Sequence, residues 1–110
     1  MPRPRRRRRV SGRPDWNVFK PKGVPLSSLR QIDLNSDELE ALRLKHREEL
    51  TQEEAAEEMD VSRSTFSRIL KEAHQKITEF LVEGESLRIE DPDYVRYMEK
   101  PRKRKKEKMR

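Results

Sequence analysis

The residues best suited to chemistry in this chain are hydroxyl, guanidinium, ammonium and amide side chains that recur at helical spacing after residue 61. Arginine can bind guanine or phosphate, and serine or glutamine can hydrogen-bond to base edges. At about 100° per residue, one helical face holds these groups together. The pattern predicts a helix that contacts double-stranded DNA through Ser62, Arg63, Ser64, Thr65, Ser67, Arg68, Lys71 and Gln75.

The same stretch carries an apolar stripe on the face opposite those polar groups. Its members are spaced three and four residues apart, which is typical of an amphipathic helix: Phe66, Ile69, Leu70, Ala73 and Ile77. Ser62 is a good N-cap, and Gly84 is a good C-terminal stop. These signals predict a helix over residues 62–82.

A shorter helix is predicted immediately before it, over residues 52–59. Thr51 and Glu54 have the spacing of a capping box. Ala55 and Ala56 allow another helix to cross closely, and Asp60 falls at a turn position that needs a left-handed backbone. We therefore predict a helix-turn-helix with a positive φ at Asp60. The alternative is an ordinary helical hairpin whose polar face is merely solvated.

The elements around this motif are expected to complete an all-α fold, a small helical bundle. We predict a supporting helix over residues 35–49, capped by Asn35, and a helical turn near residues 27–32. Residues 15–26 contain Trp and Phe and are expected to form an extended strap that adds core to the helices. Residues 87–90 alternate apolar and charged side chains, which is typical of one short strand. Its partner would be Val10, Val18 to Phe19, or a second chain.

We expect three parts in the chain: a basic disordered arm over 1–14, a helix-turn-helix domain over 15–90 and a basic tail over 91–110. The charge is positive at both ends of the chain and negative in the middle. Residues 1–30 hold ten Lys or Arg against one acid, residues 31–100 hold ten against nineteen, and residues 101–110 hold seven against one. An acidic domain is repelled by phosphate, so the basic ends must supply much of any attraction to nucleic acid. The arm residues expected to contact phosphate or the minor groove are Arg5, Arg6, Arg7, Arg8 and Arg9. A solubilising tail is the alternative for this arm.

Other function classes find little support in the sequence. We find no Gly-rich phosphate loop, no His-Glu-x-x-His and no nucleophile elbow, so we expect neither an enzyme nor a cofactor, metal or small-molecule substrate. His46 and His74 are interpreted as surface or boundary residues. The chain has no cysteine and no apolar run of about 18 residues. We expect a cytoplasmic, nucleoid-associated protein without membrane contact.

Several motifs resemble known families. The run LEALRL, LTQEEAAEEM and VSRSTFSRIL over residues 39–77 resembles sigma-70 region 4, which reads the −35 promoter element. Residues 1–90 resemble a second family more closely. This is the small prokaryotic family labelled domain of unknown function 134, whose members are described as predicted DNA-binding proteins. The resemblance is carried by MPRPR, FKP with GVP, DELEALRL, AAEEM, SRSTF and LVEG with LRI. The chain departs from such families in having Asp60 where Gly is usual, and arginine where the basic opening often has a cysteine.

The resemblance and the residue pattern together imply a sequence-specific double-stranded DNA-binding protein, a transcriptional regulator reading the major groove. An RNA-binding protein that uses the arginine-rich arm is one alternative. A protein-interaction adaptor that uses its acidic surface is another. The oligomeric state, including a homodimer, stays open.

Overall fold

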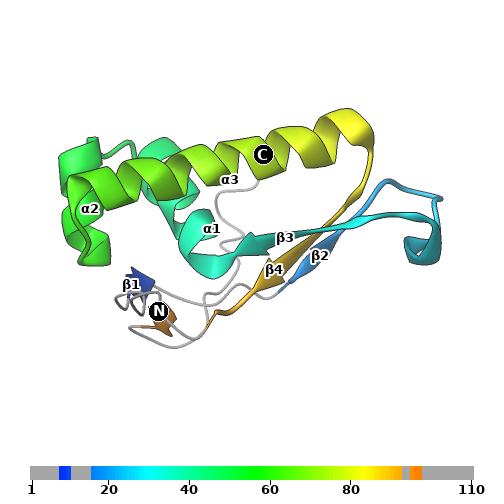
Figure 1. Ribbon diagram of the computed structural model, residues 1–110, viewed down its shortest axis with the longest axis horizontal. Helices are drawn as coiled ribbons and strands as arrows, with labels where there is room; N and C mark the ends of the chain where they lie inside the picture. Colours follow the sequence, from blue (N-terminus) through cyan, green and yellow to red (C-terminus); the bar gives the residue numbers. More distant parts are fainter. Residues whose placement is uncertain (1–7, 11–15, 93–94, 98–110) are drawn as a thin grey trace, which may run out of the picture.

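The computed structural model describes residues 8–10, 16–92 and 95–97. Figure 1 shows one long helix that runs along most of the longest axis of the molecule. The elements in chain order are β1 (Arg8–Val10), β2 (Val18–Phe19), the 3-10 turn η1 (Leu26–Ser28), β3 (Gln31–Asn35), α1 (Ser36–Leu42), the π-helical segment η2 (Arg43–Arg47), α2 (Gln52–Met59), α3 (Arg63–Glu83), β4 (Ser86–Glu90) and β5 (Val95–Tyr97).

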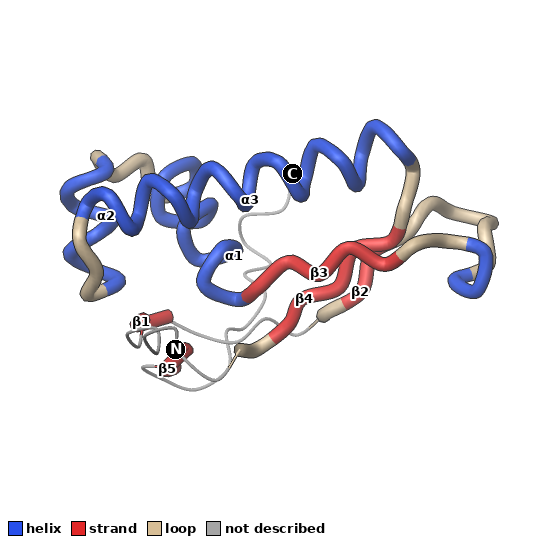
Figure 2. Tube along the Cα trace, in the orientation of Figure 1, coloured by secondary structure: helices blue, strands red, loops and turns tan. Residues whose placement is uncertain are grey.

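The expectation of an all-α fold is wrong, because three strands form a mixed sheet beside the helices. The strand order is β2-β4-β3: β2 is antiparallel to β4, and β3 is parallel to β4. Parallel neighbours need a crossover connection, and here all three α-helices lie between β3 and β4 in the chain (Figure 2). The motif is thus enclosed within the connection between two paired strands.

Strand β3 replaces part of the expected helical turn near residues 27–32. Only η1 is helical there, and it is a single 3-10 turn. From residue 31 the chain is extended, with Ile32 and Leu34 buried and Gln31 and Asp33 exposed. This two-residue period is the pattern of a strand that has one covered face.

The strand expected over residues 87–90 is present as β4. Of the partners that the sequence left open, Val18 to Phe19 pairs with it, and β3 is its second partner. The strap itself was interpreted wrongly. Val18 is 43% exposed and Phe19 is 40% exposed, so their side chains add little core. The segment instead pairs its backbone with β4 at the outer edge of the sheet.

The two ends of the described chain also pair with each other. Strand β1 lies parallel to β5, with Val10 opposite Tyr97. Residues 8–10 therefore do not belong to a disordered arm, although residues 1–7 and 11–14 of that arm lie outside the described residues. In the same way, residues 95–97 of the expected C-terminal tail form a strand.

The supporting helix is divided where the sequence predicted one continuous helix over 35–49. Helix α1 begins at Ser36, and the Glu38 carboxylate accepts from the backbone N–H of Asn35 at 2.9 Å. It continues into the π-helical η2, and Glu49 then has a φ of 60° that ends it. The predicted start is confirmed, and the predicted end is two residues too long.

Helix α3 joins two hydrophobic clusters. Its N-terminal half places Phe66, Ile69 and Leu70 against residues of α1, η2 and α2. Its C-terminal half covers the sheet, where Ala73 packs with three buried strand residues: Ile32, Leu34 and Leu87. The sheet therefore holds one end of α3, and α1 and α2 hold the other. Within the described part of the chain, none of the helices combines the length and the apolar character that a membrane span requires.

Candidate nucleic-acid interface

The turn between α2 and α3 has the backbone that the sequence predicted. Asp60 has φ 59° and ψ 45°, which is left-handed, and its N–H donates to Glu57 O at 3.1 Å. The N–H of Val61 donates to Ala56 O at 3.0 Å, so two carbonyls at the end of α2 are satisfied. Val61 then packs against the helical core cluster. This turn fixes where α3 starts relative to α2.

Replacing Asp60 with Val should destabilise the fold by about 1–2 kcal/mol, since a β-branched side chain is poorly tolerated at positive φ. The measurement is urea unfolding followed by circular dichroism. Asp60→Gly is the matched control, because glycine adopts this conformation without a Cβ penalty. A Val variant as stable as the Gly variant would contradict the role assigned to this turn.

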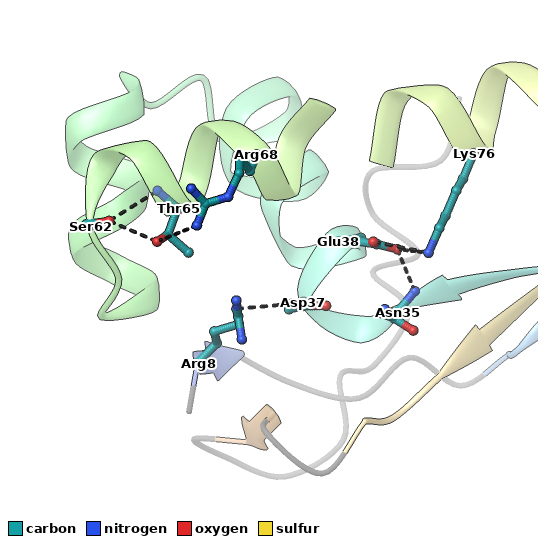
Figure 3. Close-up of polar contacts among 8 residues, drawn as sticks. All are labelled: Arg8, Asn35, Asp37, Glu38, Ser62, Thr65, Arg68 and Lys76. Carbon is teal, nitrogen blue, oxygen red and sulfur yellow. Dashed lines mark hydrogen bonds and ion pairs between the residues drawn. The ribbon is translucent and has the colours of Figure 1, made fainter. Parts of the chain in front are cut away.

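Both helices of the motif begin with the caps that their sequences predicted. In α2, Thr51 Oγ1 accepts from the Glu54 N–H at 3.1 Å, and Glu54 Oε1 accepts from the Thr51 N–H at 2.8 Å. In α3, Ser62 Oγ accepts from the Thr65 N–H at 3.1 Å and donates to Thr65 Oγ1 at 2.9 Å. Arg68 Nη2 reaches the same Thr65 hydroxyl at 3.4 Å (Figure 3). Ser62 and Thr65 therefore hold the start of α3 and position Arg68.

The residues that the sequence predicted to contact DNA lie at the start of α3 and along its exposed side. Thr65 is half-buried, and the others are exposed: Ser62, Arg63, Ser64, Ser67, Arg68, Lys71 and Gln75. The buried side of the helix holds Phe66, Ile69, Leu70 and Ala73. This arrangement leaves donors and acceptors of the outer face in contact with solvent, where a ligand can reach them.

The cations on α3 differ in whether they already have an acidic partner. Lys76 Nζ binds both oxygens of Glu38, at 2.8 and 3.1 Å. Burial raises the pKa of Glu38, while this hydrogen bond from Lys76 opposes the shift. By contrast, no ion pair joins Arg63, Arg68 or Lys71 to a carboxylate within the described ranges. Those three charges are available to an anionic ligand.

Two arginines of the basic arm are held against the domain. Arg8 is only 8% exposed, and its Nε lies 3.3 Å from Asp37 Oδ2 on α1 (Figure 3). Arg9 Nη2 donates to the Glu57 carbonyl of α2 at 3.1 Å. Arg8 and Arg9 thus anchor the arm, which differs from the free phosphate-binding role expected from the sequence. Arg5, Arg6 and Arg7 lie outside the described residues.

This anchor brings β1 next to the start of α3. A hollow of about 310 Å³ lies between β1 and the helix, lined by Arg8, Val61, Ser62, Thr65, Arg68, Ile69 and Glu72. Residues 1–7 precede β1 in the chain. The attachment of β1 therefore places Arg8 beside the start of α3.

Comparison with known proteins identifies the family of this chain. The family model described as "Protein of unknown function DUF134" matches residues 1–97. The chain belongs to this family.

Its relatives in the family are similar over most of their length. UPF0251 protein TTE1845 of Caldanaerobacter subterraneus subsp. tengcongensis is 50% identical over 99 residues, covering 90% of this chain and 84% of the relative. A UPF0251 protein of Halothermothrix orenii is 48% identical over 94 residues, covering 86% and 70%. One from Aeromonas salmonicida is 46% identical over 95 residues, covering 84% and 93%. No solved structure matches the chain.

Three side-chain pairs in this family member were missed from the sequence: Arg8 with Asp37, Lys76 with Glu38, and His46 with His74. Each joins residues far apart in the chain, so no local spacing signals it. The acids Asp37 and Glu38 were visible as first-turn residues of a predicted helix, but their burial was not. Within the part of the chain that the structure describes, no group of three or more His, Cys, Asp or Glu side chains could hold a metal.

Proposed function

We propose that this chain is a sequence-specific double-stranded DNA-binding protein that reads the major groove with α3. The single observation that carries the proposal is the pair α2 and α3 joined through left-handed Asp60, with an exposed polar face on the second helix. A helix-turn-helix places the N-terminal residues of its second helix against base edges. The exposed residues assigned here are Ser64, Arg68, Lys71 and Gln75, with Arg63 and Ser67 at the margins of the face.

Electrostatics restricts where DNA could contact the chain. Residues 31–100 carry nineteen acids and ten Lys or Arg, so this stretch of the chain as a whole repels phosphate. Attraction must therefore come from the basic ends and from cations on the polar face of α3 that have no acidic partner among the described residues. The proposed site of action is the cytoplasmic chromosome, and the proposed role is that of a transcriptional regulator.

Selection of bound sequences from random duplex DNA tests this function. The expected result is an enriched motif, whose symmetry also reports whether one or two copies bind. Competition with structured RNA separates this proposal from binding through an arginine-rich arm. Enrichment of no sequence, or preferential retention of RNA, would overturn the assignment.

Arg68→Ala should weaken binding to the selected site by about 1–3 kcal/mol and relax the preference at one base position. The physical reason is the loss of a guanidinium that can bind a base through two N–H groups. The measurement is fluorescence anisotropy with the selected duplex and with single-base variants of it.

The control for this prediction is Arg88→Ala, which removes the same charge from an exposed position on β4. It should leave base preference unchanged. If Arg68→Ala lowers affinity equally for every sequence, Arg68 contacts phosphate. If it has no effect, the wrong face of α3 has been assigned.

A further inference from the structure

Two histidines from different elements meet head to head on the surface. His46 belongs to η2 and His74 to the middle of α3, and both are exposed. Their Nε2 atoms are 2.8 Å apart. The ring centroids are 5.0 Å apart and the ring planes are inclined by 48°. Two nitrogen lone pairs would repel each other at this distance. Either one ring donates an N–H···N hydrogen bond to the other, or a third atom binds both nitrogens.

The backbone on each side of this contact is held by the core. Leu44, two residues before His46, is 2% exposed, and Ala73, immediately before His74, is fully buried. Segment η2 is closed by hydrogen bonds from the Glu48 N–H to Arg43 O at 2.9 Å and from the Leu50 N–H to Leu44 O at 3.1 Å. The Cα positions are therefore fixed, while the exposed rings can turn about their side-chain bonds.

The spacing of the two nitrogens matches that of neighbouring ligands on one metal ion. Two nitrogens that bind an ion at about 2.0 Å are roughly 2.8 Å apart at a right angle and roughly 3.3 Å apart at a tetrahedral angle. The observed 2.8 Å therefore fits adjacent positions of a square-planar or tetragonal ion, which copper(II) and nickel(II) prefer. Zinc would need the rings to separate.

We propose that His46 and His74 form a two-imidazole site for a divalent late transition-metal ion of the copper(II) or nickel(II) type. On binding, the ring that carries its proton on Nε2 changes to the Nδ1–H tautomer, so that both Nε2 lone pairs turn toward the ion. Water completes the coordination, because both rings face solvent. The ion ties η2 to α3, and this inference does not depend on DNA binding.

The composition makes this site unusually easy to test. The sequence contains two histidines in all and no cysteine, so any signal from coordinated imidazole comes from this pair. The full-length chain without an affinity tag is titrated with copper(II) chloride. Electron paramagnetic resonance then counts the coordinated imidazole nitrogens, and calorimetry with a competing chelator gives the affinity and stoichiometry.

The expected result is one copper(II) per chain with two imidazole nitrogens. His74→Ala and His46→Ala, made separately, should each lower the affinity at least about tenfold, because each removes one ligand. Copper(II) should also raise the Tm of the original chain and not that of either variant. Gln75→Ala is the matched control for metal binding, since Gln75 is an exposed neighbour of His74 without an imidazole.

Three results would overturn the site. One is a spectrum with a single imidazole or none, which would place copper on the chain terminus or on carboxylates. Another is undiminished affinity in both alanine variants while circular dichroism shows them folded. The third is one ion shared by two chains, which sedimentation would reveal as a copper-dependent dimer.

Discussion

Arg8→Met is expected to lower the free energy of unfolding by about 3 kcal/mol, a large share of the stability of a small domain. The Arg8 side chain is 10% exposed and that of Asp37 is 2% exposed. Arg8 Nε lies 3.3 Å from Asp37 Oδ2. Removing one partner of a buried ion pair leaves the other charge desolvated and poorly compensated. Urea unfolding, followed by circular dichroism, measures the change.

Two further variants test whether the loss of stability comes from the buried ion pair. Arg9→Met removes the neighbouring arginine, which is half-buried and donates to the Glu57 carbonyl, and should cost only about 1 kcal/mol. Arg8→Met combined with Asp37→Leu removes both charges and should recover much of the loss. If Arg8→Met is no worse than Arg9→Met, the buried pair contributes little to the attachment of β1.

Deleting residues 1–7 should make the proposed DNA binding much less sensitive to salt. The deletion removes four arginines and leaves β1 in place. If each arginine neutralises one phosphate, the slope of log affinity against log salt falls by about 3.6 units, at about 0.9 per contact. Between 50 and 200 mM salt, the intact chain should then lose roughly 150-fold more affinity than the deletion variant.

The control for the deletion is replacement of the same seven residues by a Gly/Ser segment of equal length. It should behave like the deletion, because charge and not length carries the effect. The preference among DNA sequences should largely survive in both. An unchanged slope would mean that the arm does not contact phosphate, and a lost preference would move sequence reading from α3 to the arm.

Prediction from sequence worked where the signal was local. The capping box of Thr51 and Glu54, the N-cap Ser62, the left-handed Asp60 and the stop at Gly84 each involve residues within one turn. All are observed at the predicted positions. Together with the apolar spacing of α3, they were enough to place the polar face of the candidate interface.

Prediction failed where the deciding partner is distant in sequence. Ile32 and Leu34 alternate with polar residues, but the helical signals beside them led to the prediction of a helical turn. The strand that pairs with them, β4, lies on the other side of the helix-turn-helix in the sequence. The arginine run was expected to be disordered because like charges repel. That argument could not include Asp37, which compensates Arg8 only once α1 and β1 are packed together.

The order of strands in the sheet has a consequence for how the chain is made. The central strand, β4, is the last of the three to be synthesised, and both of its neighbours precede the helices. On the ribosome, α1, α2 and most of α3 emerge while Ile32 and Leu34 still lack Leu87 and Ile89 beside them. Closing this long loop is slow compared with forming a helix. We therefore expect the nascent helix-turn-helix to form first and to gain the sheet that braces the far end of α3 only when β4 emerges.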